Sequence, residues 1–394
     1  MILDRPNRRT LVVCALAAIL ALLALYARLK PDPERLRARA QAEYNAGRFV
    51  EAQSVLDQLT RFSSPSAADL MVRAQTARAL GRTNDALRDW AAIRADDPLG
   101  PTARFLAGRE QVARGRLRDA EALFLDIPDQ SPLTPRALRE LAYIYALQQR
   151  LDLLDAAFAK LSAAGELDDM SLLLWSRIHF GSWDTGSDLA TLGKALEADP
   201  DDRWTRLALA SGLRRAARLD DAAQLLIALP QSDPEARALR AALAFDRGNL
   251  DLAESLLADG SPNHPKLARL RGSIALVQHN PHAAVNYFQI AYHAGLRDRA
   301  TLFGLANALK LDGANTNAAT FFNAARRIDD LGTLIREANS TALDRSPDLP
   351  TRIGVAFAAV QRNLEARAWL NLAIRRDPLD QTAQHALFLL DHPN

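Results

Sequence analysis

A small residue that returns along the chain at an almost constant interval constrains the fold more than any other feature. The first six occurrences are 34 residues apart, and the later intervals are 31, 31, 34 and 48 residues. The members of this small column are Ala40, Ala74, Gly108, Ala142, Ser176, Ala210, Ala241, Gly272, Ala306 and Gly354. A period of this length predicts a stack of similar units in place of a single closed core.

Two further columns follow the small column at fixed distances. Twelve residues after each small residue, eight of the ten positions are alanine, as at Ala120 and Ala284. Four residues later comes a large apolar side chain, such as Phe124 or Phe288. Apolar positions three or four residues apart share one face of a helix, so each unit is predicted to be a pair of helices in which alanines make room for a large side chain.

Glycine marks the predicted turn between the two helices in half of the units, because glycine readily adopts the left-handed backbone that ends a helix. These turn glycines are Gly47, Gly81, Gly115, Gly248 and Gly313. Proline is favoured at the start of a helix and recurs near the start of several units, as at Pro132 and Pro265. The clearest unit runs from Pro101 to Pro132.

These columns, with Ala-x3-Phe at Ala120–Phe124 and Ala284–Phe288, make the chain resemble the tetratricopeptide repeat (TPR) family, whose unit is a 34-residue helix-turn-helix. The resemblance covers residues 33–385, although leucine replaces the family's first-helix tryptophan, as at Leu36 and Leu70. It implies an all-α solenoid, a right-handed superhelix of about ten units. About nine of these units occupy residues 33–328, and a last one occupies 350–390.

Two stretches depart from the repeat. Around residues 179–192 the alanine column falls on Asp188, which predicts a distorted fifth unit. An insertion at residues 329–349 separates the last unit from the others. A lengthened helix or a loop is the simpler interpretation of this insertion, and a lid or hinge is the alternative.

The N-terminus predicts a membrane anchor. A basic tail at residues 1–9 precedes a segment at 10–28 that includes seventeen uncharged residues, Leu11 to Ala27. At about 1.5 Å per residue this helix is near the lower limit for crossing a bilayer core of about 30 Å. A cleaved secretory signal is the alternative, but Leu25-Tyr26-Ala27 has a large residue where cleavage requires a small-x-small pattern.

Basic residues give opposing indications of the anchor's orientation. Five follow the apolar segment closely and three precede it, which by count favours a cytoplasmic body. A short tail with three arginines resists translocation, however, and is typical of signal-anchors. We therefore expect a single-pass protein of a bacterial inner membrane with an extracytoplasmic body, and keep the cytoplasmic body as the alternative.

The sequence does not predict an enzyme, a cofactor or a metal site. Cys14 is the only cysteine, and no phosphate-binding loop, dinucleotide-binding motif or hydrolase elbow is present. The alternative is a metal-dependent or catalytic protein that uses the region of His279, His282 and His293, the only histidine cluster. We interpret this cluster instead as part of a solvated turn between helices.

Binding is the predicted activity, because stacked two-helix units leave their first helices lining a concave groove. Arginine and aromatic side chains dominate protein-binding hot spots, and both types occur at the expected groove positions. The predicted groove residues are Arg37, Gln41, Tyr44, Met71, Gln75, Arg78, Phe105, Arg109, Arg139 and Tyr143. Nucleic acid is disfavoured as a partner, because 47 acidic residues are interspersed among 49 basic ones.

The expected function is therefore a membrane-anchored scaffold. Residues 10–28 would contact the lipid bilayer, and the groove would bind proteins or peptides during assembly or regulation of a membrane or envelope complex. The sequence leaves the partner and the oligomeric state open.

Overall fold

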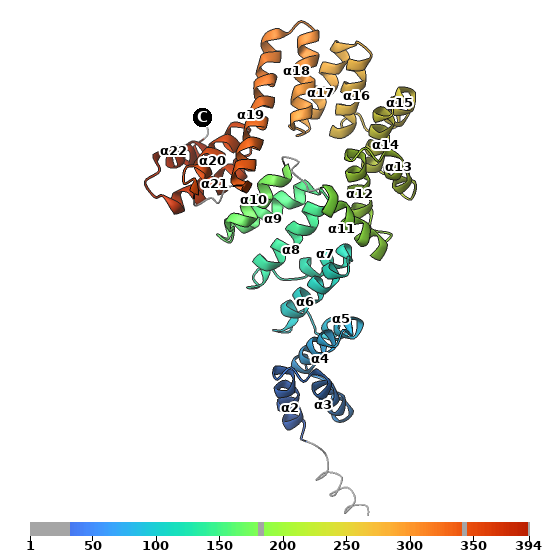
Figure 1. Cartoon of the computed structure of the whole chain (residues 1–394), viewed down its shortest axis with the longest axis vertical. Helices are drawn as coiled ribbons and strands as arrows, with labels where there is room; N and C mark the ends of the chain where they lie inside the picture. The colour runs from blue at the N-terminus through green and yellow to red at the C-terminus, as the bar shows by residue number, and fades with distance from the viewer. Residues whose placement is uncertain (1–31, 180–184, 341–344, 393–394) are drawn as a thin grey trace, which may run out of the picture. The chain divides into compact units, whose positions relative to one another are not determined.

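The computed structural model describes residues 32–179, 185–340 and 345–392, and within these residues it contains twenty-one α-helices and no strand (Figure 1). In chain order the helices are α2 (Pro33–Asn45), α3 (Phe49–Phe62), α4 (Ala67–Ala79), α5 (Thr83–Ala92), α6 (Gly100–Ala113), α7 (Leu117–Leu125), α8 (Thr134–Leu147), α9 (Leu151–Ala163), α10 (Asp169–His179), α11 (Thr185–Ala198), α12 (Arg203–Arg215), α13 (Leu219–Ile227), α14 (Pro234–Asp246), α15 (Leu250–Ala258), α16 (Pro265–Val277), α17 (Pro281–His293), α18 (Arg299–Leu311), α19 (Asn315–Ser340), α20 (Leu349–Ala359), α21 (Asn363–Arg376) and α22 (Gln381–Asp391). The predicted all-helical fold is confirmed.

The turns inside the helical pairs have the predicted conformation. All five predicted turn glycines have a positive φ, between 74° and 90°. Four other turns carry a residue with a side chain at the same position, at Gln149, Ala217, His279 and Gln361, with φ between 56° and 62°. A left-handed backbone costs roughly 1–2 kcal/mol for such residues, so the turn is imposed by packing of the two helices and not by glycine alone.

The small column lets the two helices of a unit approach closely. A Cβ atom at Gly108 would lie 2.6 Å from the ring of Phe124, and one at Gly272 would lie 2.9 Å from Phe288. Ala120 and Ala284 are fully buried beside these rings. The predicted packing of small against large side chains is therefore confirmed in these units.

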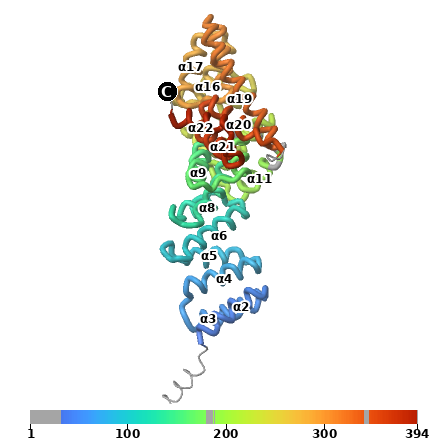
Figure 2. The backbone as a smooth tube through the Cα atoms, turned by 90° about the vertical axis from the view of Figure 1, so that its left-hand side faces the viewer, coloured from blue at the N-terminus to red at the C-terminus, as the bar shows by residue number. Residues whose placement is uncertain are grey.

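The chain divides into two compact units. The first contains the described residues up to Gln111 together with Ala122–Leu133, and the second contains Val112–Glu121 and the described residues from Thr134 onward. In the first unit, the pairs α2–α3 and α4–α5 follow one another along the tube in Figure 2. Trp90, which is 1% exposed, fills the centre of the core between α4, α5 and α6.

In the second unit, helices far apart in sequence pack together. Helix α10 packs against α19 and α21 (Figure 1). The Trp369 indole N–H on α21 donates a hydrogen bond of 2.8 Å to the Ser176 hydroxyl on α10, and both residues are fully buried. Arg376 binds Asp169 at 2.5 Å across the same interface. We call this interface the α10–α21 closure, because it joins the two ends of the succession of helices from α10 to α21.

A second ion pair adjoins the closure. Arg362, at the start of α21, lies 3.3 Å from the carboxylate of Asp155 on α9. Asp155 also accepts a hydrogen bond of 2.7 Å from the indole N–H of Trp175 on α10. Trp175 in turn stacks on Phe158 of α9 with ring centroids 5.2 Å apart. The closure therefore holds α9, α10 and α21 together through both polar and aromatic contacts.

The closure explains why the fifth unit departs from the repeat. Ser176 is the fifth member of the small column, and it packs against Trp369 in place of a large residue from the following helix. The main packing partners of α10 are α9, α19 and α21, whereas α11 packs on α12. Residues 180–184, which connect α10 to α11, lie outside the described residues.

Helix α19 accounts for much of the predicted insertion. It runs without a break from Asn315 to Ser340 and so continues through the first part of residues 329–349. Leu331, Ile335 and Ala338 on this extension are at most 3% exposed. Their spacing of four and three residues places them on one helical face, so this part of the insertion is a packed helix.

No helix among the described residues is both long enough and apolar enough to cross a bilayer. The predicted anchor at residues 10–28 lies outside the described residues, as does the basic tail at 1–9. Both stay predictions.

Replacement of Trp369 by phenylalanine tests the closure. The substitution removes the indole donor to Ser176, and we expect it to cost about 1–2 kcal/mol more than the matched change Trp90→Phe. Trp90 is equally buried, but its indole N–H has no partner among the described residues. Urea unfolding measures the cost, and hydrogen exchange should show faster opening of α10 and α21. Equal destabilisation by the two substitutions would contradict the assigned role.

Candidate functional site

The ten predicted groove residues fall on first helices, as expected. Eight lie in the first compact unit, on α2, α4 and α6, and Arg139 and Tyr143 lie on α8 in the second. Gln41, Arg78, Arg109 and Tyr143 are exposed. Each compact unit therefore presents its own candidate surface.

Two of the predicted groove residues are part of the core. Met71 is 7% exposed and Phe105 is 5% exposed, and the Phe105 ring lies 6.0 Å from that of Phe124. Each stands three positions before a member of the small column, Ala74 or Gly108, and therefore shares its buried helical face. In this structure neither side chain offers surface to a ligand.

The arginines predicted to be hot spots bind neighbouring units of the repeat. Arg37 on α2 donates from Nε to both carboxylate oxygens of Asp69 on α4, at 3.1 Å. Arg78 on α4 donates to Glu110 on α6 at 3.0 Å. Arg139 on α8 donates to the backbone oxygen of Glu166 at 2.5 Å. These side chains link successive repeats, so a ligand that binds one of these arginines would have to compete with its existing hydrogen bond.

Gln41 and Tyr44 contact residues that are close to them in sequence. Gln41 donates to Asn45 on its own helix at 2.9 Å, and Tyr44 packs against Phe49 with ring centroids 5.7 Å apart. Gln75 is half-buried. Within the first unit, Gln41, Arg78 and Arg109 are therefore the predicted groove residues that are exposed, although none of the three is without an interaction partner.

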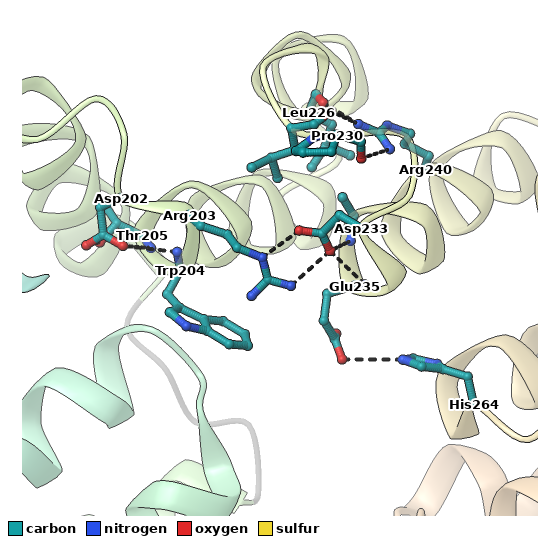
Figure 3. A network of polar contacts seen from close by, with 12 residues as sticks. Asp202, Arg203, Trp204, Thr205, Leu226, Pro230, Asp233, Glu235, Arg240 and His264 are labelled. Atoms are coloured by element: carbon teal, nitrogen blue, oxygen red, sulfur yellow. Dashed lines mark hydrogen bonds and ion pairs between the residues drawn. The ribbon is translucent and has the colours of Figure 1, made fainter. Parts of the chain in front are cut away.

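Arginine also binds an acidic residue of the next repeat in the second compact unit, and there the acidic residue is a helix cap as well (Figure 3). Asp233 caps α14 by accepting from the backbone N–H groups of Glu235 and Ala236, both at 3.0 Å. Arg203 on α12 donates to its two oxygens at 2.5 and 2.9 Å. Burial alone would raise the pKa of Asp233, but the bonds from Arg203 and the backbone lower it below its usual value. One carboxylate thus starts a helix and ties it to the preceding unit.

Between α14 and α16, the next pair of first helices, the acidic residue lies on the earlier helix and the basic residues lie on the later one. His264 occupies the N-cap position of α16 without making a side-chain cap, and the acid is Glu235 on α14, the first helix of the preceding repeat (Figure 3). Glu235 lies 3.5 Å from His264 Nε2 and 2.7 Å from Lys266 Nζ. The hydrogen bond with His264 and the nearby Lys266 lower the pKa of Glu235 to about 2.

A tryptophan flanked by two arginines lies beside these ion pairs. The ring of Trp204 on α12 has the guanidinium of Arg203 at 4.2 Å from its centroid and that of Arg150 at 5.1 Å. Arg150 also lies 4.8 Å from the ring of Tyr145. We call these four residues the Trp204 cluster. Trp204 is half-buried, and tryptophan and arginine are the residue types most enriched at binding hot spots.

The Trp204 cluster joins elements that are not neighbours in the repeat. Gln148, at the end of α8, donates to Asp202 at 3.0 Å and to Thr205 at 3.1 Å at the start of α12. The turn between α8 and α9 therefore contacts α12 directly, although α9, α10 and α11 intervene in sequence. The repeat period carries no signal for such a contact, so the cluster cannot be predicted from the columns.

The predicted histidine region is dispersed in the structure. His279 forms the left-handed turn after α16, His282 lies 3.5 Å from Asp312, and His293 ends α17. His282 and His293 are eleven residues apart on one helix, or about 16 Å at 1.5 Å per residue. No group of three or more histidine, cysteine or acidic side chains in the described part of the chain is arranged to hold a metal ion.

The pH dependence of unfolding tests the contacts of Glu235 with His264 and Lys266. A lowered pKa means that Glu235 stabilises the fold fully above about pH 4.5 and that this contribution is lost as the pH falls through about 2. Glu235→Gln should therefore cost at most about 3 kcal/mol at pH 7 and progressively less below pH 4.5. Urea unfolding at several pH values measures the difference. The exposed Glu197→Gln is the control, and a cost for Glu235→Gln that did not change with pH would contradict the assignment.

Comparison with known proteins gives three kinds of match. A family model described as tetratricopeptide repeat matches residues 71–133, 105–166 and 269–332. A curated relative, the "Cellulose synthase 2 operon protein C" of Komagataeibacter xylinus, is 27% identical over 270 residues. These residues are 67% of this chain, and the chain spans 18% of the length of that relative.

Solved structures also match the chain. One is a tetratricopeptide repeat protein from Parabacteroides merdae ATCC 43184, with 17% identity, 62% of this chain and 98% of that chain covered, and a TM-score of 0.34. Another is the Cut9-Hcn1 hetero-tetramer of APC/C, with 14% identity, coverage of 95% and 89%, and a TM-score of 0.35. A third is a monomeric mutant of IFIT1 with Gppp-AAAA, with 14% identity, 91% of this chain and 85% of that chain covered, and a TM-score of 0.38.

The segments matched by the family model contain the columns from which the repeat was recognised. They include Gly108, Ala120 and Phe124 in the first two segments, which overlap, and Gly272, Ala284 and Phe288 in the third. The resemblance predicted from the sequence is confirmed, and residues 71–166 and 269–332 of this chain match the tetratricopeptide repeat model.

Proposed function

We propose that the chain is a scaffold that binds other proteins during assembly or regulation of a membrane or envelope complex. Its tetratricopeptide repeats support a role in protein–protein interaction. The observation that carries the proposal furthest is the Trp204 cluster, where a half-buried tryptophan lies between two guanidinium groups on a first helix. A partner that covered this ring would bury a large apolar area and gain forked hydrogen bonds.

The proposed partner presents acidic and apolar side chains. Arg203 already binds Asp233, so a carboxylate of the partner would share the guanidinium of Arg203. It would not replace Asp233, because that side chain is only 6% exposed and loss of a buried partner is costly. Proteins or peptides of this kind are the proposed ligands of the first helices in each compact unit. The second unit presents the Trp204 cluster and the exposed Tyr143, and the first presents the exposed Gln41, Arg78 and Arg109 as a separate surface.

We place the scaffold at a membrane because of the apolar segment at residues 10–28. A membrane anchor confines the repeats to the bilayer and so raises their effective concentration towards membrane-bound partners. The relative from Komagataeibacter xylinus is named for a cellulose synthase operon. By analogy with that name, a polysaccharide-producing envelope complex is the assembly that we propose for this chain.

The enzymatic alternative receives no support from the histidines on which it depends. Its candidate residues, His279, His282 and His293, lie in a turn and at opposite ends of α17, and do not converge. The proposed function therefore requires no metal ion.

Capture of partners from solubilised bacterial envelope tests the scaffold. Trp204→Ala in the full chain should reduce the amount of captured protein at least tenfold, because loss of a hot-spot residue costs about 2 kcal/mol or more. Leu252→Ala, at a residue 47% exposed on the second helix α15, is the control and should capture as much as the unchanged chain. Deletion of residues 1–31 should abolish function in the cell. Undiminished capture by Trp204→Ala would refute the proposed surface.

The side of the membrane is tested with reporters fused after Asn394. An extracytoplasmic body should give active alkaline phosphatase and a dark green fluorescent protein. The opposite pair of results would place the body in the cytoplasm, as the count of basic residues favours. Equal activity of both reporters in soluble fractions would argue against the anchor itself.

A further inference from the structure

We propose that a pocket on α17 is a binding site for a neutral saccharide chain. The pocket has a volume of about 510 Å³ and is lined by Asn263, Asn286, Gln289, Ile290, His293 and Ala294. It is separate from the Trp204 cluster and from every groove residue predicted from the sequence. Ligand pockets in proteins typically have volumes of roughly 300–1,000 Å³.

The pocket exists because two corresponding second helices differ in length. Helix α15 has 9 residues and ends at Ala258, whereas α17 in the next unit has 13 residues and continues to His293. The chain after α15 forms a loop that carries Asn263, and this loop lies beside the longer helix. Positions 286, 289, 290 and 293 share one face of α17 because they are three, four and seven residues apart.

Both walls of the pocket are held in place by packing and hydrogen bonds. The Arg271 guanidinium donates to the backbone oxygens of Leu257 at 2.6 Å and Gly260 at 2.9 Å, and so fixes the loop before Asn263. Phe288, on the opposite face of α17, fits between Gly272 and Gly304, where added Cβ atoms would lie 2.9 and 2.5 Å from its ring. A pocket with fixed walls loses little entropy when a ligand binds.

The carboxamides that line the pocket are uncharged and exposed to solvent. Helix α17 contains no aspartate, glutamate, lysine or arginine, although 24% of the chain is charged. The side-chain amides of Asn263, Asn286 and Gln289 make no hydrogen bond to any described residue. Each carboxamide offers one acceptor and two donor hydrogens. Such a group can accept from one hydroxyl and donate to the neighbouring hydroxyl of a sugar ring.

The apolar part of the lining suits the same ligand. Ile290 and Ala294 lie between the polar side chains, and a pyranose ring presents apolar C–H groups beside its hydroxyls. Residues 286 and 293 are about 10 Å apart along the helix axis, which is close to the length of a disaccharide. The His293 ring adds an aromatic surface that is braced edge-on by Tyr292, with ring centroids 5.5 Å apart.

A saccharide fits this surface better than an uncharged peptide does. An extended peptide alternates its side chains between two faces and is usually bound by the free edge of a β-sheet. A helix face has no free backbone N–H or C=O groups to pair with such a peptide, because they are used within the helix. The three carboxamides can therefore bind sugar hydroxyls, and the apolar residues can pack against sugar C–H groups.

Titration of the full chain with cellotetraose, maltotetraose and chitotetraose tests the proposal, in a detergent that carries no sugar. We expect at least one of these tetrasaccharides to bind by isothermal titration calorimetry. Asn286→Ala and Gln289→Ala should each weaken its binding by about three- to tenfold, the loss expected for one hydrogen bond. The matched control is Gln224→Ala, which removes an exposed carboxamide from the second helix α13 and should leave binding unchanged.

Three results would overturn the proposal. The first is that none of the three tetrasaccharides binds at millimolar concentration. The second is that one of them binds the Asn286→Ala and Gln289→Ala variants as tightly as it binds the unchanged chain. The third is that an uncharged peptide of serine, glycine and alanine displaces the bound sugar from the unchanged chain and from the variants. Circular dichroism of each variant checks that α17 is still folded. If Asn286→Ala unfolds the helix, the exposed Gln289→Ala decides the outcome.

Discussion

The hydrogen bond between Trp369 and Ser176 joins two helices that the repeat alone would keep apart. In an open stack of repeats each unit contacts only its neighbours, and stability is close to a sum of local terms. Here α21 covers α10, and the buried indole, the Arg376–Asp169 pair and the Arg362–Asp155 pair all act at one interface. Loss of the buried bond would affect every unit between these helices, because it weakens the interface that holds their two ends together.

Arginine and aspartate have a second structural role in this chain. Asp233 caps one helix and binds an arginine of the preceding unit, and Asp298 does the same for α18 and Arg269. An exposed ion pair alone contributes little, but a carboxylate already fixed by backbone N–H groups has lost its conformational freedom before the arginine binds. The charged residues of the first helices therefore position the repeats, and only some of them remain for a partner. The Trp204 cluster combines both roles.

The sequence predicts contacts between neighbours well and distant contacts poorly. Gly108 and Phe124 were predictable because the spacing within one unit is fixed by the helix period. The pairing of Ser176 with Trp369 was not, because the columns describe each unit separately and those residues are 193 positions apart. Met71 and Phe105 were assigned to a groove, but a first helix packs against its own second helix and against the next unit, which buries a wider arc than one partner would. The pocket on α17 depends on a difference in helix length, and helix ends are the least certain part of any pattern.

The closure also sets an order of events during synthesis. Neighbouring repeats can fold as soon as both have left the ribosome, since their contacts are local. The Ser176 face of α10 must wait for Trp369, 193 residues later, which takes about 10–40 s at roughly 5–20 residues per second. During that interval a buried serine and the neighbouring apolar surface of α10 remain open to other chains. A nascent chain of this kind is therefore most vulnerable to misassociation after its fifth unit, and completion of the last unit ends that period.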